Sequence, residues 1–300
     1  MNLQPLFTQP ILRQCLFPDV HPGQASDVWL VETRDESVIV RRTRMSSEPA
    51  NDFWWGCRDL FGVDPTDLFA LEGMNRVLGE LSPIPVPQVL RKAVVDGVPY
   101  VVVEKMPGTT LRSFQSLPTE ALVQLGEALA RIHARKFSEC GTLSGRLRYP
   151  VGQFHKRMAA TMRELVQRYY ADVPEISILL DEMCAQLLAL PPLRHASLIM
   201  LDMDPTQFLH ENGRITALVD TEVYALGPRE LELVALEYLL DKASAAAFVS
   251  GYESVLPFPD LRQVRAPYRY FCRLMEVQGP VDIDAWMNGP KWFDEVGSPL

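Results

Sequence analysis

The pattern of hydrophobic and polar positions changes about a third of the way along the chain. Residues 28–32 and 37–42 are short β-branched runs separated by a polar stretch, which predicts a hairpin. A second hairpin is predicted for residues 89–95 and 98–104, because Asp96-Gly97 between them suits a tight turn. The first third of the chain is therefore predicted to be mainly strand.

Helical spacing dominates after about residue 105. Only residues 65–81 show that spacing earlier; later segments with apolar residues every three or four positions are 119–138, 154–170, 176–190 and 229–273. Short strands are predicted at 198–200 and 214–219. Strands followed by helices indicate an α+β fold. We expect a small antiparallel-sheet lobe (residues 1–105) joined to a larger, mostly helical lobe (residues 106–300).

Composition and charge narrow the function classes. The chain has 300 residues, 47% of them hydrophobic, which is typical of a folded globular protein. Its 29 basic and 38 acidic residues give a net charge of −9, which argues against a nucleic-acid partner. We find no apolar run long enough to cross a membrane and no signal-peptide pattern.

The cysteines and histidines show no metal-binding or disulfide spacing. The five Cys lie far apart in the sequence, and the five His form no HExxH-like pattern. We therefore expect reduced thiols and a cytoplasmic protein without a membrane partner.

Residues 198–222 (LIMLDMDPTQFLHENGRITALVDTE) carry the candidate chemistry. Asp202 follows a short strand, Gln207 lies five residues on, and Asp220 ends the second strand of the hairpin that follows. Two carboxylates and an amide at neighbouring strand ends suit phosphoryl transfer, in which one carboxylate orients the attacking hydroxyl and oxygen ligands hold Mg²⁺. From spacing alone, the acids could equally be ordinary loop carboxylates.

The order of these parts resembles the catalytic loop of the aminoglycoside phosphotransferase and choline kinase-like family, which has a protein-kinase-like fold. The family pattern is approximately HGDLHPGNLLVDDGRVTGVIDWE. Aligned without a gap, Asp202 falls on its catalytic Asp, Gln207 on its Mg²⁺-binding Asn and Asp220 on its second Mg²⁺-binding Asp. Glu222 matches the Glu after it, and Glu232 stands where the family has a downstream Asp.

The resemblance extends from about residue 20 to 275 and implies a nucleotide site. Gly23 to Asp27 is similar to the family's short phosphate-side loop, which implicates Gly23 and Ser26. Arg41 takes the place of the phosphate-binding Lys, with Arg42 as the alternative, and Glu72 that of its carboxylate partner. The backbone of the hinge residues Glu104, Lys105 and Met106 is implied to bind adenine.

Four positions depart from the family pattern at the catalytic loop. Its two His are Met200 and Asp204, its Gly is Leu201, and its Asn is Gln207. Because both carboxylates remain, the resemblance implies an ATP- and Mg²⁺-dependent kinase acting on a hydroxyl of a small molecule. The alternative is a catalytically impaired kinase-like protein that binds a nucleotide or metabolite.

Two further points stay open from the sequence. Acidic residues in the C-terminal segment either favour a cationic acceptor or form a solvated surface; they are Asp260, Asp282, Asp284, Asp294 and Glu295. Trp54 and Trp55 either pack in the core or flank the nucleotide. The acceptor's identity and the oligomeric state cannot be inferred.

Overall fold

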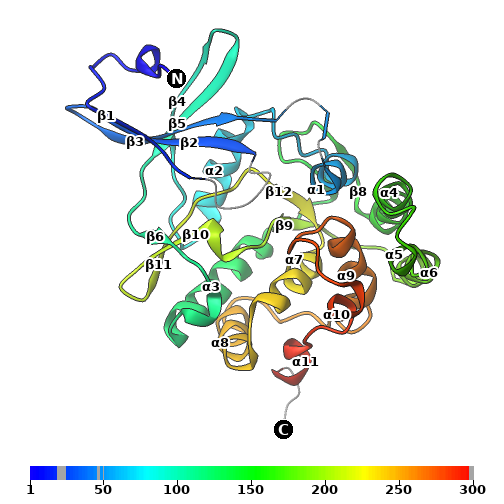
Figure 1. The fold of residues 1–300 in the computed structure, drawn as a ribbon. Coiled ribbons are helices and arrows are strands. Elements are labelled where there is room, and N and C mark those ends of the chain that lie inside the picture. The colour runs from blue at the N-terminus through cyan, green and yellow to red at the C-terminus, as the bar shows by residue number, and fades with distance from the viewer. Residues whose placement is uncertain (19–24, 46–47, 50, 297–300) are drawn as a thin grey trace.

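The computed structural model describes residues 1–18, 25–45, 48–49 and 51–296. Within them, an antiparallel sheet forms the smaller lobe, with strand order β1-β2-β3-β5-β4 (Figure 1). Its strands are β1 (Arg13–Leu16), β2 (Ser26–Glu32), β3 (Ser37–Thr43), β4 (Val89–Val95) and β5 (Val98–Glu104). Both predicted hairpins are present. The second has its predicted bounds because Asp96 and Gly97 both adopt the left-handed turn conformation.

The two faces of this sheet are covered differently. One face packs Trp29, Val31 and Val40 against the N-terminal η1 turn (Gln4–Leu6). The other face packs Val101 and Val103 against the chain entering α2 (Ala70–Leu81), at Leu68 and Leu71. The second face is the one that turns toward the larger lobe.

The larger lobe consists of helices around two further sheets, with orders β11-β10-β6 and β8-β7-β12-β9. The strands are β6 (Thr109–Thr110), β7 (Glu139–Gly141), β8 (Arg148–Pro150), β9 (Ser197–Met200), β10 (Phe208–Glu211), β11 (Arg214–Leu218) and β12 (Tyr224–Gly227). The helices are α3 (Thr119–Ala134), α4 (Phe154–Tyr169), α5 (Pro174–Ser177), α6 (Leu180–Ala189), α7 (Arg229–Leu236), α8 (Lys242–Glu253), α9 (Arg265–Leu274), α10 (Ile283–Met287) and α11 (Trp292–Val296). Short 3-10 turns are η3 (Phe114–Ser116), η4 (Val151–Gln153), η5 (Pro205–Gln207) and η6 (Glu237–Leu239).

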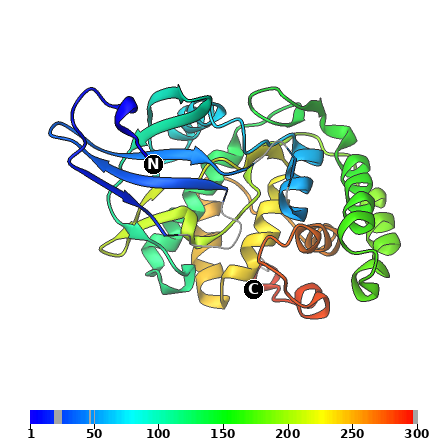
Figure 2. The ribbon, with the colours of Figure 1, turned by 45° about the horizontal axis from the view of Figure 1, so that its top comes forward.

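A segment between β3 and α2 leaves the small sheet and packs with the helical lobe. It contains α1 (Asp52–Gly56) and η2, a π-helical turn at Cys57–Phe61 that ends at Gly62 in the left-handed conformation. Figures 1 and 2 show it beside α4 and outside the small sheet. Trp54 is buried in the large core, and Trp55 lies under the Arg168 guanidinium, so both tryptophans are packing residues.

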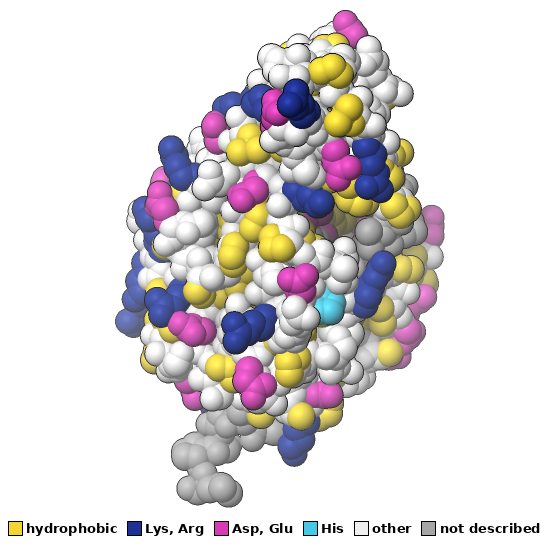
Figure 3. Space-filling view, turned by 90° about the vertical axis from the view of Figure 1, so that its left-hand side faces the viewer, with side chains coloured by type: hydrophobic (Ala, Val, Ile, Leu, Met, Phe, Trp, Pro, Cys, Tyr) yellow, Lys and Arg dark blue, Asp and Glu magenta, His cyan; other side chains and the backbone are white. Residues whose placement is uncertain are grey.

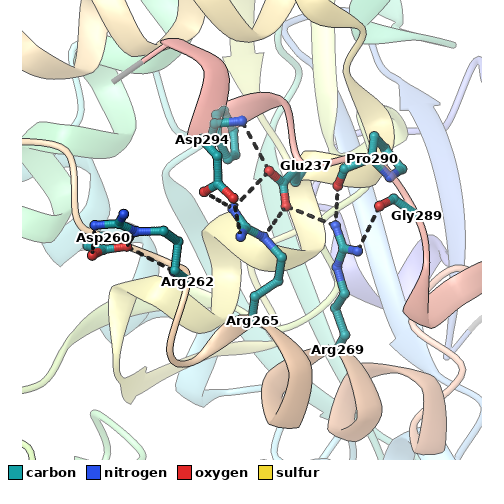
Figure 4. A network of polar contacts seen from close by, with 9 residues as sticks. Glu237, Asp260, Arg262, Arg265, Arg269, Gly289, Pro290 and Asp294 are labelled. Atoms are coloured by element: carbon teal, nitrogen blue, oxygen red, sulfur yellow. Dashed lines mark hydrogen bonds and ion pairs between the residues drawn. The ribbon is translucent and has the colours of Figure 1, made fainter. Parts of the chain in front are cut away.

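A buried ion-pair network attaches the C-terminal segment to α9 (Figure 4). The carboxylate of Glu237 accepts hydrogen bonds from Arg265 Nε and Arg269 Nη2, both at 2.9 Å. Arg265 also pairs with Asp294 at 2.6 Å, and Arg269 donates to the Gly289 carbonyl at 2.9 Å. These charges are compensated by one another, as buried charges must be.

The surface carries charges of both signs. On the face in Figure 3, Lys and Arg side chains are interspersed with Asp and Glu. None of the helices in the described ranges has the length and apolarity to cross a membrane.

Candidate active site

The chain after β9 brings Asp202 and Gln207 together. Asp204 caps η5 by accepting hydrogen bonds from the Thr206 backbone and hydroxyl at 2.8 and 2.6 Å. Gln207 ends this short turn, and its side chain points to Asp202: the Gln207 Nε2 donates a hydrogen bond to Asp202 Oδ2 at 3.1 Å. The backbone N–H of Val219 donates to the Gln207 carbonyl at 2.9 Å, which places Asp220 at the same edge.

The Asp202 carboxyl has an unusual environment. Burial raises its pKa to about 7, and the nearby negative charges of Asp220 and Asp204 add to the rise, whereas the Gln207 hydrogen bond opposes it. A carboxyl with a pKa near neutrality can take up a proton under ordinary conditions. Asp202 is therefore suited to the role of a general base.

Arg41 lies on the cleft side of the small sheet and reaches the larger lobe. Its Nη2 is 2.6 Å from Asp220 Oδ1 and 3.0 Å from Glu222 Oε1, and its side chain is only 9% exposed. Arg42, the alternative from the sequence, points to the other face and pairs with Asp27. The structure thus places Arg41 rather than Arg42 beside Asp220.

The expected ion pair between Arg41 and Glu72 is not formed, and that expectation was wrong. Glu72 is exposed on α2 and pairs with Lys92 of β4. The side of α2 that meets the segment after Asp220 carries Asn75, whose Oδ1 accepts a hydrogen bond from Thr221 and whose Nδ2 donates to the Pro87 carbonyl.

The remaining nucleotide-side residues lie along the junction of the lobes. The Ser26 hydroxyl, at the start of β2, donates to Glu222 Oε1 at 3.2 Å. Glu104 ends β5, and Lys105 and Met106 follow it toward β6, where the Pro107 carbonyl accepts a hydrogen bond from Thr216 at 2.7 Å. Gly23 lies outside the described residues.

The oxygen atoms at the site fit a hard cation such as Mg²⁺. Within the described ranges, the Oδ2 of Asp220 and the Oε1 of Gln207 have no hydrogen-bond partner, so each residue has an uncommitted oxygen. The Asp202 carboxyl also lies near the carboxylates of Asp220 and Asp204, whose charges help to raise its pKa after burial. The described part of the chain has no group of three or more His, Cys, Asp or Glu that could hold a metal, so a bound ion would need further oxygens, such as those of a phosphate.

A buried histidine–glutamate pair contacts the end of β9, the strand that leads into the Asp202 loop. Glu232 Oε2 accepts the Met200 N–H at 3.0 Å and contacts His133 Nε2 at 2.9 Å. The other nitrogen of His133 contacts the Tyr252 hydroxyl at 2.9 Å. Glu232 stands at a position that the family resemblance marks, but nothing in the spacing of His133 and Glu232 predicts that they meet.

The side of the loop away from the small sheet is bounded by two segments that the sequence did not assign. The Gln278 side chain donates to the Met203 carbonyl at 2.8 Å. On η2, burial and the Asp202 charge together raise the pKa of Cys57, which places this thiol near Asp202. The loop after α9 and the π-helical turn thus both lie near the loop that carries Asp202.

The acidic residues of the C-terminal segment are largely engaged elsewhere. Asp260 pairs with Arg262, Asp282 caps α10, and Asp294 pairs with Arg265. The side chain of Glu295 is not described. These contacts favour a surface and packing role over recognition of a cationic acceptor.

The two-lobed arrangement, with Asp202, Gln207 and Asp220 at the lobe junction, defines a kinase-like fold and site. A family model described as "Phosphotransferase enzyme family" matches residues 19–267. The chain belongs to this family and is accordingly a small-molecule kinase, a phosphotransferase. No curated protein matches it.

Solved structures share the fold at low sequence identity. Macrolide 2'-phosphotransferase MphH from Brachybacterium faecium is 14% identical, with a TM-score of 0.61 over 96% of this chain and 97% of that one. A thermostable mutant of aminoglycoside phosphotransferase APH(4)-Ia, in complex with ADP and hygromycin B, is 17% identical (TM-score 0.61, 98% and 92% covered). The GDP and kanamycin complex of APH(2")-IIIa is 15% identical (TM-score 0.62, 98% and 95% covered).

Proposed function

We propose that this protein transfers the γ-phosphoryl group of ATP, with Mg²⁺, to a hydroxyl of a small molecule. The observation that carries the proposal is the Asp202 carboxyl, whose pKa is raised to about 7 and which Gln207 holds beside Asp220. An acceptor hydroxyl next to Asp202 would be oriented for in-line attack and would pass its proton to this carboxylate.

The other site residues would bind the nucleotide phosphates, the adenine and Mg²⁺. Arg41 would hold the phosphates through the guanidinium N–H groups that Asp220 and Glu222 leave free. Ser26 and Gly23 would lie on the phosphate side, and the backbone of Glu104, Lys105 and Met106 would bind adenine. Asp220 and Gln207 would hold Mg²⁺, which, when bound, neutralises the charge that develops on the phosphate oxygens.

Nucleotide binding is the first test of this function. We expect ATP with Mg²⁺ to raise the melting temperature, because ligand that binds only the folded state stabilises it. GTP should be titrated in parallel, because the solved neighbours include GDP complexes. Absence of stabilisation by either nucleotide, with and without Mg²⁺, would contradict the proposal.

Turnover in Asp202→Asn is the second test. Release of ADP in the presence of hydroxyl acceptors should fall on the order of a thousandfold or more with nucleotide binding kept, because the base is lost while the phosphate contacts stay. Asp260→Asn is the matched control, since Asp260 is an exposed carboxylate paired with Arg262. A wild-type protein that binds nucleotide but phosphorylates no acceptor would instead support the impaired, ligand-binding alternative.

A further inference from the structure

The carboxylate that holds Arg41 does not come from α2. Glu72, the only acid in the first turn of that helix, is exposed and pairs with Lys92. A cavity of about 490 Å³ is bounded by α2 on one side and by Thr221, Glu222 and Tyr224 on the other. The contact of α2 with this segment runs through Asn75 and Thr221, both neutral. The helix therefore offers no charge to Arg41.

Glu222 provides that charge instead. Its side chain is 12% exposed, and its Oε1 is 3.0 Å from Arg41 Nη2 and 3.2 Å from the Ser26 hydroxyl. The contact joins three separate parts of the chain: β3, the start of β2, and the segment that follows Asp220. Glu222 therefore holds the same Nη2 as Asp220, from a more enclosed side chain, and contributes to the position of Arg41.

Asp220 is the other anion that contacts Nη2 of Arg41. Its Oδ1 is 2.6 Å from Arg41, but its side chain is 44% exposed, in contrast to the enclosed Glu222. If Asp220 also serves as a metal ligand, its share in holding the guanidinium is reduced. Glu222 then remains as the enclosed anion that fixes Nη2, while Nη1, which has no partner among the described residues, is left for a ligand.

We propose that Glu222 is the positioning residue for Arg41 and that, with Ser26, it sets the geometry of the phosphate-binding side of the cleft in place of Glu72. This inference rests on the proposed function, because it assumes that Arg41 binds nucleotide phosphate. It assigns to the segment after Asp220 the part that the sequence had given to α2.

The test compares Glu222→Gln with the matched variant Glu72→Gln by calorimetric titration with ADP, with and without Mg²⁺. We expect Glu222→Gln to weaken ADP binding on the order of tenfold or more. The variant loses the charge-assisted contact that positions Arg41, the residue proposed to bind the phosphates. Glu72→Gln should bind within about twofold of the wild type, since its carboxylate is exposed and paired elsewhere. Glu222→Asp, which keeps the charge, should recover part of the affinity.

A double-mutant cycle separates positioning from a general structural effect. If Glu222 acts through Arg41, the Glu222→Gln change should cost little further affinity in an Arg41→Gln background. Additive losses would overturn the proposal.

The remaining outcomes are also distinct. If the wild-type protein binds no nucleotide, the proposed function itself fails. If it binds, and Glu72→Gln weakens binding while Glu222→Gln does not, only the inference about Glu222 fails. Glu72→Gln changes an exposed side chain and keeps the fold, so a large loss of affinity there overturns the inference even if Glu222→Gln does not fold.

Discussion

Asp202 combines three features at one side chain: partial burial, two acidic neighbours and one amide donor. In the ligand-free protein its pKa lies at about 7, against an ordinary value near 3.9. Between these two values the folded protein holds a proton that the unfolded chain has lost. The free energy of unfolding therefore falls as the pH rises through this window, and the penalty is complete above about pH 7.

Asp202→Asn should remove this penalty. The amide is neutral and its oxygen can still accept from Gln207, so the variant should gain about 2 kcal/mol over wild type near pH 8, half of what such a shift would give for a fully enclosed group. Near pH 4 the gain should vanish. Urea unfolding of the ligand-free proteins measures both values, and an equal gain at the two pH values would contradict the assignment. Asp260→Asn serves as control and should show no gain near pH 8, because Arg262 lowers the pKa of Asp260 to about 2.

For single residues, the sequence predicted which side chains gather at the site better than it predicted the ion-pair partner of each one. The resemblance of residues 198–222 placed Asp202, Gln207 and Asp220, and the structure brings them to one edge. Of the two arginines left open by the sequence, Arg41 lies beside Asp220, and Arg42 points to the other face of the sheet. The partner of Arg41 could not be predicted, because the side of α2 that faces the cleft depends on tertiary packing and not on the helical period alone.

The elements with strong local signals were predicted well. The hairpin of β4 and β5 follows from β-branched strands around a turn that accepts left-handed conformations, and the apolar spacing of α3 and α4 predicted helices close to those observed. The short α1 and η2 and the four-residue β12 were not predicted. Five residues or fewer carry too little periodicity, and these elements are stabilised by burial against the helical core.

The crossing of α3 and α8 depends on two glycines. A Cβ on Gly126 would overlap the Phe248 carbonyl, and one on Gly251 would overlap the Val123 carbonyl. In both cases the obstacle is backbone of the facing helix, which cannot rotate away. The two helices can therefore lie this close only with glycine at both positions.

Gly251→Ala should destabilise the protein by at least about 2 kcal/mol, because the helices must separate to admit the methyl group. The matched control is Gly79→Ala, in the exposed part of α2 with no atom near the added carbon. It should stabilise by about 0.5–1 kcal/mol through helix propensity. Denaturant unfolding measures both; a tolerated Gly251→Ala would show that α8 is not held against α3 as described.

At the scale of the whole molecule, the two lobes are joined by polar contacts around the site as well as by the chain itself. Arg41 and Ser26 reach Glu222, Arg41 reaches Asp220, and Asn75 reaches Thr221. All of these contacts converge on the three residues from Asp220 to Glu222, which follow the hairpin of β10 and β11. The fold class could be predicted because strand and helix patterns are segregated along the chain, but this convergence could not, since it joins residues more than a hundred positions apart.

We propose that these two lobes assemble a phosphotransferase whose base is Asp202. The most direct test of this proposal is mass spectrometry of hydroxyl-bearing acceptors (aminoglycosides, macrolides, choline and sugars) incubated with the protein, Mg²⁺ and ATP or GTP. At least one acceptor should gain a single phosphoryl group with wild type and with Asp260→Asn, and none with Asp202→Asn. Phosphorylation by Asp202→Asn at the wild-type rate would contradict the account.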